Sequence, residues 1–368
     1  MAKASATKTG AVERKLVGVA DAVIAAAERS RDPALSIPVR SLANVTFNAK
    51  RGIIEMGKRR QARTFFNVGM AKKFMQTVLV ADALAELQRA NLTTSLREIY
   101  YRTKHTMKGS HENTFDGQNE SDPLIEDLEV TLAALREELH VRAENAGSIV
   151  GPVVLVDDGD PVNCARLGKG GYSVPSIVEP EYIEIRRCTA DFVLLVEKGT
   201  QWNRLSEDKF WRRYNCVLLT GNGQPPRGVR RLARRLHEEY GIPVYVLVDN
   251  DPWGYYIYSV VKQGSINLAF ESERMAIPKA QFIGLSSADP DRYGLPRNVG
   301  IKLNDKDVGR ARELLKYRWF EKKPWQGEIK RMLAAGLKYE LDALANKDFR
   351  YLTQTYLPGK LRERDWLD

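Results

Sequence analysis

The second half of the chain alternates short apolar runs with amphipathic stretches. Each apolar run has the length of a strand, and helical periodicity starts near residues 227 and 253. The predicted strands cover residues 191–196, 216–219, 243–248, 267–270 and 281–285. Strands that alternate with helices favour a mostly parallel sheet flanked by helices. This half of the chain therefore predicts an α/β fold.

The first half has a helical pattern instead, and the pattern changes near residue 147. Apolar positions recur at mostly helical spacing over residues 11–29 and again from Phe65 to Leu84. We expect a basic, partly helical extension, then a small helical module, then the α/β domain with flanking strands and C-terminal helices. These three parts cover residues 1–69, 70–147 and 148–368.

The charge of the chain favours a polyanionic partner. Its formal net charge is +10, its pI is near 9.3, and residues 1–70 hold 13 Lys and Arg against 5 Asp and Glu. Lys58 and Arg59 belong to a tight basic group there, which suits contact with DNA phosphates. The three cysteines lack metal-ligand spacing, and no signal segment or membrane-spanning run is visible. We therefore expect a cytoplasmic protein with no membrane partner.

Three acids follow apolar runs that the pattern predicts as strands. Glu197 ends one run, and Asp249 and Asp251 follow another. Open α/β sheets bind ligands at the carboxyl ends of their strands, so these acids converge if the two strands are neighbours. Three carboxylates suit Mg²⁺, which prefers oxygen ligands. The alternative is that Asp251 caps the following helix ahead of a proline and Asp249 only starts the turn.

A tyrosine pair, Tyr100 and Tyr101, stands among basic residues in the helical module. A tyrosine phenol has a pKa of about 10 and is a poor nucleophile until a metal, a cation or a base helps it lose its proton. The residues that offer this help are Arg97, Arg102, Lys104 and His105. Adjacent helical residues point about 100° apart, so at most one ring of the pair faces a phosphate. The alternative is one core ring and one surface ring without chemistry.

Five arginines recur at helical spacing in the second half of the chain. They are Arg227, Arg230, Arg231, Arg234 and Arg235. Apolar residues occupy the opposite face of this predicted helix, so one face carries a ribbon of guanidinium groups. We expect this ribbon to contact the DNA backbone, and the alternative is a solvated charged face.

The segment Gly52–Lys58 matches most of a phosphate-binding loop. However, Arg59 stands where a serine or threonine should hold Mg²⁺, and no clear strand precedes the segment. We therefore expect no ATP site there, which leaves any use of ATP to a partner.

Several of these motifs resemble one known family. The matching stretches are Arg97–Tyr101, Phe115–Ser121, Val196–Lys198, Gly223–Gly228 and Asp249–Val260. In this combination the chain resembles the A subunits of DNA topoisomerase VI, the archaeal type IIB enzyme. The meiotic double-strand-break protein is related to them. The likeness extends over about residues 40–368.

The resemblance implies a winged-helix domain of the catabolite-activator type followed by a toprim α/β domain. It implies that Tyr101 is the nucleophile and that Arg97, one helical turn earlier, assists the phosphate or the phenol. It further implies that Glu197, Asp249 and Asp251 bind Mg²⁺. Glu197 is also a candidate for moving a proton.

The resemblance also implies partners and an activity. A homodimer of A subunits would join two ATPase B subunits in an A2B2 heterotetramer on double-stranded DNA. It would make a transient double-strand break with 5′-phosphotyrosyl ends, pass a second duplex and relax supercoils. One alternative is a dedicated break-forming protein without strand passage. Another is a non-enzymatic winged-helix protein that only binds DNA.

Overall fold

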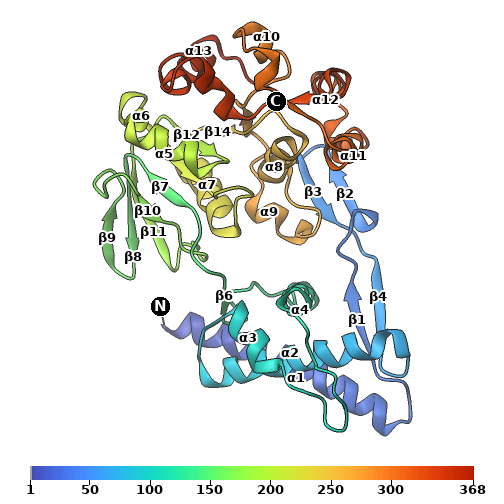
Figure 1. Cartoon of the computed structure of the whole chain (residues 1–368). Coiled ribbons are helices and arrows are strands. Elements are labelled where there is room, and N and C mark those ends of the chain that lie inside the picture. Colours follow the sequence, from blue (N-terminus) through green and yellow to red (C-terminus); the bar gives the residue numbers. More distant parts are fainter. Residues whose placement is uncertain (1) are drawn as a thin grey trace. The chain divides into compact units, whose positions relative to one another are not determined.

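The computed structural model describes residues 2–368, with side chains from residue 10 onward, and divides into two compact units. The first unit comprises the residues up to 45 together with residues 56–144, and the second comprises residues 46–55 and 145–368 (Figure 1). Residues 1–69, which we expected to form a separate extension, are divided between these two units. Most of that segment packs within the first unit, and its middle part packs within the second.

The first unit is mainly helical. Its helices are α1 (Ala2–Glu28), α2 (Val68–Ala90), α3 (Leu96–Thr103) and α4 (Gln118–Leu132), with the short 3-10 helix η1 (Leu42–Asn44). Its strands are β1 (Ala34–Pro38), which pairs antiparallel with β4 (Arg60–Thr64), and β5 (Thr94–Ser95), which pairs in parallel with β6 (Val141–Arg142). Buried apolar side chains such as Leu84, Ile99 and Leu124 join α2, α3 and α4 into one core.

Local sequence fixes the start of α3, the helix that carries the tyrosine pair. Ser95 and Glu98 form a capping box, in which the Glu98 backbone N–H donates to Ser95 Oγ at 3.2 Å and the Ser95 N–H donates to Glu98 Oε2 at 2.9 Å. Hydrogen bonds from the Thr94 hydroxyl and from Ser95 lower the pKa of Glu98 to about 2. The cap is therefore ionised and formed across the neutral pH range.

A hairpin from the N-terminal part of the chain belongs to the second unit. Its strands β2 (Val45–Asn48) and β3 (Ile53–Met56) pair with each other. Phe47 packs near Trp319, with 6.1 Å between the ring centroids. The chain therefore passes between the two units three times, after residues 45, 55 and 144.

The second unit is built around a mostly parallel sheet, as predicted. Over the described residues this sheet has six strands in the order β10-β7-β13-β12-β14-β15. In chain order they are β7 (Ser148–Val150), β10 (Tyr172–Ser173), β12 (Phe192–Val196), β13 (Cys216–Thr220), β14 (Val244–Leu247) and β15 (Gln281–Phe282). β12 pairs in parallel with both β13 and β14, β15 is parallel to β14, and β7 is antiparallel to β13.

One predicted strand is wrong. Residues 267–270 lead into the 3-10 helix η2 (Ala269–Glu271), which is followed by α9 (Ser272–Met275). This helical turn buries Glu271, whose carboxylate pairs with Arg227 at 2.5 Å. The apolar run is too short to distinguish a strand from a helical turn, and the turn places Glu271 in a buried ion pair.

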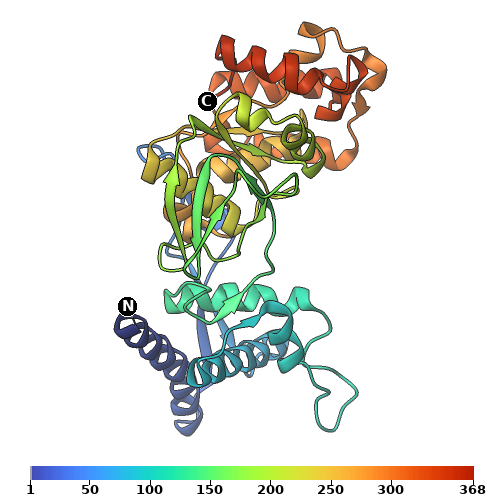
Figure 2. The same ribbon diagram turned by 90° about the vertical axis from the view of Figure 1, so that its left-hand side faces the viewer.

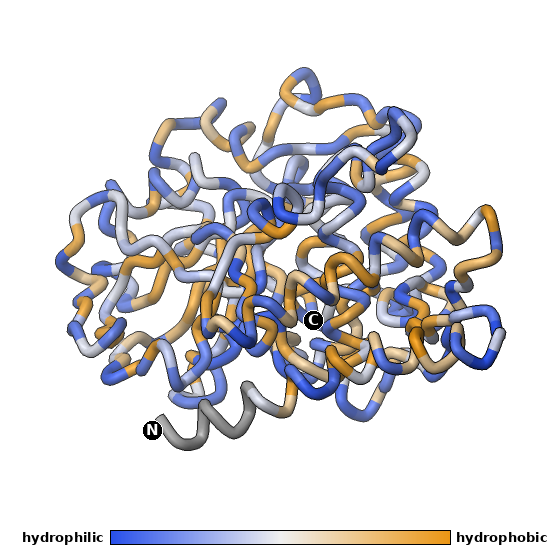
Figure 3. Tube along the Cα trace, turned by 90° about the horizontal axis from the view of Figure 1, so that it is seen from below, coloured by the Kyte–Doolittle hydropathy of each residue, from blue (hydrophilic) through white to orange (hydrophobic). Residues whose placement is uncertain are grey.

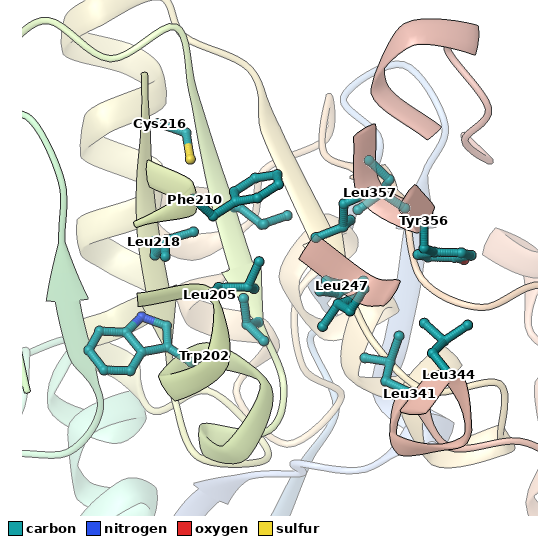
Figure 4. Close-up of a cluster of buried hydrophobic side chains, with 14 of the residues drawn as sticks. Trp202, Leu205, Phe210, Cys216, Leu218, Leu247, Leu341, Leu344, Tyr356 and Leu357 are labelled. Carbon is teal, nitrogen blue, oxygen red and sulfur yellow. The ribbon is translucent and has the colours of Figure 1, made fainter. Parts of the chain in front are cut away.

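Helices flank the sheet and share its core. They are α5 (Gly199–Glu207), α6 (Phe210–Arg213), α7 (Arg227–Tyr240) and α8 (Pro252–Gln263). Every residue of β12 and β13 is buried. Figure 4 shows part of this core, where Leu205 and Phe210 from the helices meet Leu218 of the sheet. Figure 3 traces the resulting alternation of hydrophobic and hydrophilic stretches along the chain.

A second sheet and a C-terminal helical part complete this unit. The second sheet is antiparallel with the order β11-β8-β9, formed by β8 (Val153–Asp157), β9 (Asp160–Asn163) and β11 (Ile183–Cys188). The C-terminal helices are α10 (Asp289–Arg292), α11 (Asp305–Leu314), α12 (Lys323–Ala335) and α13 (Leu357–Glu363), seen in orange and red in Figure 2. Shorter elements are η3 (Arg297–Val299), β16 (Ile301–Lys302), η4 (Arg318–Phe320), β17 (Leu337–Lys338), η5 (Leu341–Asn346) and a π-helical turn (Leu352–Tyr356).

Trp325 of α12 anchors the C-terminal part to the rest of the second unit. Its ring stacks on Tyr258 at 5.2 Å and meets Phe282 edge to face at 5.3 Å. Aromatic residues of the C-terminal part therefore pack onto the sheet domain. None of the helices among the described residues is long and apolar enough to cross a membrane.

The packing of the sheet gives a stability prediction. Leu218 lies in β13 and is fully buried, whereas Leu167 is 41% exposed. We expect Leu218→Ala to lower the free energy of unfolding of the second unit by about 2–5 kcal/mol, because it leaves a cavity in a closed core. Leu167→Ala should change it by less than about 0.5 kcal/mol. Tryptophan fluorescence during urea unfolding measures this unit alone, since all tryptophans lie in it. Equal effects of both changes would contradict the packing described.

Candidate functional site

The three predicted acids lie together at one edge of the parallel sheet. Glu197 directly follows β12, and Asp249 and Asp251 follow β14. Val196 is the register partner of Leu247, so the two neighbouring strands end at the same level. A hydrogen bond from the Asp249 backbone N–H to Glu197 Oε2, at 3.2 Å, joins the two strand ends.

Burial makes these acids hard to ionise together. Burial raises the pKa of Glu197 to about 7, and the nearby Asp249 carboxylate contributes to this rise. Burial likewise raises the pKa of Asp249 to about 6, and it raises the pKa of Asp251. Such a group of carboxylates favours a cation that would balance their charge.

Lys198 supplies part of that balance. Its Nζ lies 2.9 Å from Asp249 Oδ2, 2.8 Å from Glu340 and 3.1 Å from Asp342. The other oxygen of Asp249, Oδ1, accepts a hydrogen bond from the Leu341 N–H at 2.7 Å. The segment after β17 thus holds Asp249 in place from the C-terminal side.

Asp251 also caps helix α8, as the alternative interpretation expected. Its Oδ1 accepts the Gly254 N–H at 2.6 Å, and Pro252 takes the first helical position. The cap engages one oxygen of the carboxylate. Capping therefore fixes the orientation of Asp251 at the sheet edge and does not exclude a role in metal binding.

The donor set fits a hard divalent cation that is bound in part by other ligands. Among the described residues, no group of three His, Cys, Asp or Glu side chains is arranged to hold an ion by itself. Mg²⁺ characteristically takes one or two protein carboxylates and completes its shell with water and substrate phosphate oxygens. The donors at this edge of the sheet are all carboxylate oxygens, from Glu197, Asp249 and Asp251.

The two members of the tyrosine pair have different environments. Tyr101 is 60% exposed on α3, whereas Tyr100 is 8% exposed and belongs to the core of the first unit. The Arg97 guanidinium lies 5.9 Å from the centroid of the Tyr101 ring. Tyr101 is therefore the member of the pair that can reach a phosphate, with a cation one helical turn before it.

The arginines on α7 are largely engaged within the protein, and their contact with DNA stays a prediction. The ion pairs that hold them are Arg227 with Glu271, Arg231 with Glu179, Arg234 with Glu238 and Arg235 with Glu239. Arg230 is 4% exposed, and burial lowers its pKa to about 10. Its Nε has no hydrogen-bond partner among the described residues. The helical spacing was predicted correctly, but the charged face packs against the protein itself.

The basic group near residue 58 remains a candidate for DNA contact. Lys58 and Arg59 are exposed, and the Arg59 backbone N–H donates to Asn44 Oδ1 at 2.9 Å. Sequence reasoning missed Lys198 and the acids Glu340 and Asp342. Lys198 had a signal, since it directly follows Glu197, but the two acids become neighbours of the site only through the fold.

Comparisons with known proteins agree with this architecture. The model "Type IIB DNA topoisomerase" matches residues 72–141, and the model "All-beta domain in DNA topoisomerase VI alpha subunit" matches residues 143–189. The model for the toprim domain of topoisomerase 6 A subunits and Spo11 matches residues 192–361, which include the acidic edge of the sheet. The chain belongs to the family of topoisomerase 6 A subunits and Spo11. The expected order of a winged-helix domain followed by a toprim domain is confirmed.

Relatives in this family match nearly the whole chain. The A subunit of a type 2 DNA topoisomerase 6 of Pyrococcus horikoshii is 43% identical over 96% of this chain and 94% of its own. The corresponding protein of Aeropyrum pernix is 39% identical over 92% of this chain and 91% of its own, and that of Methanocaldococcus jannaschii is 34% identical over 96% of both. The expected enzyme class, a type II DNA topoisomerase, is confirmed with the family.

The raised pKa of Glu197 predicts a stability that depends on pH and on metal. An acid whose pKa is raised by folding contributes full stability below its ordinary pKa and loses it as pH rises towards 7. We therefore expect Glu197→Gln, which resembles the protonated acid, to raise the metal-free Tm at about pH 8 and to change it little at about pH 5. Mg²⁺ should stabilise the unmodified chain more at the higher pH.

Thermal unfolding at both pH values, with and without Mg²⁺, measures these effects. The Mg²⁺-dependent rise in Tm should shrink in the Glu197→Gln chain, because one ligand is lost. A lower Tm of this variant at both pH values, with an unchanged response to Mg²⁺, would contradict the site described.

The ion-paired arginine face of α7 gives a second prediction. Arg230→Met removes a buried charge that is attracted by Glu271, a carboxylate already paired with Arg227, so we expect the free energy of unfolding to stay equal or to rise by about 1–3 kcal/mol. Arg231→Met is the matched control on the same helix, because it leaves Glu179 with one cation fewer and should destabilise the protein. Urea unfolding measures both. Weaker DNA binding of the Arg230→Met chain at constant salt would contradict the burial of this face.

Proposed function

We propose that this chain cleaves and rejoins DNA as the A subunit of an ATP-dependent type IIB topoisomerase. Tyr101 is the nucleophile, Arg97 assists it, and Glu197, Asp249 and Asp251 hold Mg²⁺. The observation that carries the proposal is the pairing of an exposed tyrosine beside an arginine with a buried acidic sheet edge, in a chain of this family.

The proposed reaction exchanges one phosphoester bond for another and releases no net proton. Tyr101 Oη attacks a backbone phosphorus, a bond forms between them, and the bond from phosphorus to the sugar O3′ breaks. The phenol loses its proton and the freed O3′ gains one, so the DNA end is left as a 5′-phosphotyrosyl ester beside a 3′ hydroxyl. Religation is the reverse reaction and needs no fuel, because the ester retains the bond energy.

Each residue has a defined part in this reaction. Arg97 stabilises the negative charge on the phosphate that Tyr101 attacks. Bound Mg²⁺ supplies positive charge to the phosphoryl oxygens and to the leaving oxygen. Glu197, whose pKa is raised to about 7 chiefly by burial, is suited to hold or give up the proton that moves between phenol and sugar oxygen.

The partners follow from the same chemistry. One nucleophile per chain cuts one strand, so a double-strand break requires a two-fold pair of A subunits. The tyrosine of one copy then serves the acidic edge of the other. ATP use belongs to a B subunit in an A2B2 heterotetramer, because Gly52–Lys58 lacks the serine or threonine of a phosphate-binding loop.

Strand passage is favoured over break formation alone. The relatives that match nearly the whole chain are A subunits of type 2 DNA topoisomerase 6. Relaxation of supercoiled DNA with ATP and a B subunit therefore completes the proposed activity. A dedicated break-forming protein would cut under the same conditions without relaxing the DNA.

The tyrosine pair gives the sharpest prediction for this proposal. In a complex with a B subunit, Mg²⁺, supercoiled DNA and a non-hydrolysable ATP analogue, we expect Tyr101→Phe to abolish covalent attachment of the chain to DNA. Tyr100→Phe should still become attached, because its hydroxyl is not the nucleophile. Detergent quenching followed by gel analysis of protein-linked linear DNA is the measurement. Undiminished attachment of the Tyr101→Phe chain would sink the proposal.

A further inference from the structure

The buried tyrosine of the pair has a polar contact that packing alone does not explain. Tyr100 Oη accepts a hydrogen bond from Lys104 Nζ at 2.8 Å and donates a long one to the Asp116 carbonyl at 3.4 Å. Its ring is otherwise buried in the core of the first unit. The hydroxyl is therefore the only polar atom of this side chain, and it faces an ammonium group.

Tyr100 contacts Lys104 through its backbone carbonyl and through its ring. The Lys104 backbone N–H caps α3 by donating to the Tyr100 carbonyl at 2.9 Å, and the ammonium lies 5.2 Å from the Tyr100 ring centroid. The rings of Tyr100 and Tyr101 are 5.1 Å apart. The Lys104 ammonium thus lies over the Tyr100 ring at the end of α3, and that ring neighbours the ring of Tyr101.

Arg102, another basic residue near the pair, has its side chain engaged elsewhere. Arg102 pairs with Glu86 of α2 at 2.8 Å. His105 lies in the following turn, where its backbone N–H donates to the Thr114 hydroxyl at 3.0 Å. Of the candidates that the sequence offered, Arg97 lies over the Tyr101 ring and Lys104 over the neighbouring Tyr100 ring.

We propose that Tyr100 is a positioning residue that fixes the Lys104 ammonium beside Tyr101, where its charge stabilises the attacking phenolate. The proposal rests on the proposed function and deepens it. It explains why two tyrosines stand together, since one ring is the nucleophile and the other holds the cation that serves it. No proton passes through Lys104, which acts by its charge alone.

The charges around Lys104 support a permanent cation. The hydrogen bond to Tyr100 raises the pKa of Lys104, although its small burial opposes this, and Tyr101 and Asp116 act in the same direction. Asp116, from the loop before α4, is itself paired with Lys72 of α2 at 2.7 Å, and Glu120 of α4 lies 4.0 Å from the same lysine. Lys104 therefore remains charged throughout the range in which a topoisomerase works.

The test measures the rate of covalent attachment as a function of pH in the complete complex with a B subunit, Mg²⁺, DNA and a non-hydrolysable ATP analogue. The variants are Tyr100→Phe, Lys104→Gln, their double variant and Lys104→Arg. Arg102→Gln is the matched control, because it removes a charge of the same sign from the same helix.

We expect Tyr100→Phe and Lys104→Gln each to lower the rate near neutral pH by about tenfold, which is the effect of one nearby charge in a partly solvated site. Both should move the half-maximal rate to higher pH. The double variant should be no slower than the slower single one, because Tyr100 acts through Lys104. Lys104→Arg should restore most of the rate, and Arg102→Gln should leave it unchanged.

Normal rates and an unshifted pH profile in both single variants would overturn the inference. Effects that multiply in the double variant would also overturn it, since they would make the two residues independent. In either case loss of attachment in Tyr101→Phe would leave the proposed function intact. Matching Tm values of the Tyr100→Phe chain and the parent chain separate a change of rate from a failure to fold.

Discussion

The acidic edge of the parallel sheet is the constraint on which the rest of the second unit depends. Strand pairing in register brings Glu197 and Asp249 to the same level, and burial then makes their ionisation unfavourable. Lys198 and the Leu341 N–H offset this cost, because both contact the Asp249 carboxylate and favour its ionised form. The C-terminal segment is therefore part of the site and not an appendage, since it supplies the N–H and the two acids that hold Lys198.

Neither unit contains the complete chemistry. The first unit presents a tyrosine with cations on a capped helix, and the second presents acids that suit a divalent metal. Three chain crossings link the units, and the first two flank a hairpin that belongs to the second unit. The reactive groups are therefore divided between the two units, and the proposed cleavage requires groups from both.

Much of the fold and of the site could be predicted from local patterns. The apolar runs around Phe192 and Val244 form strands, and the acids that follow them meet because parallel neighbours end together. Residues 267–270 were predicted wrongly, because a run with only three apolar residues does not distinguish a strand from a helical turn. The turn also contains Glu271, whose partner Arg227 is distant in sequence. The ion pairs of the arginine face of α7 could not be predicted for the same reason, since the partners Glu179 and Glu271 have no local connection with the helix. Local periodicity predicts which face of an element is polar, whereas long-range contacts determine what that face meets.

The central claim is that Tyr101 of one copy and the acidic edge of another act on the same phosphodiester. Complementation tests it directly: Tyr101→Phe and Glu197→Gln chains, each inactive alone, are mixed and assembled with a B subunit on supercoiled DNA. The account predicts one competent centre in each mixed dimer, seen as a single-strand nick with one chain covalently attached. Mixed dimers that leave the DNA intact, while dimers of the unmodified chain cut both strands, would contradict it.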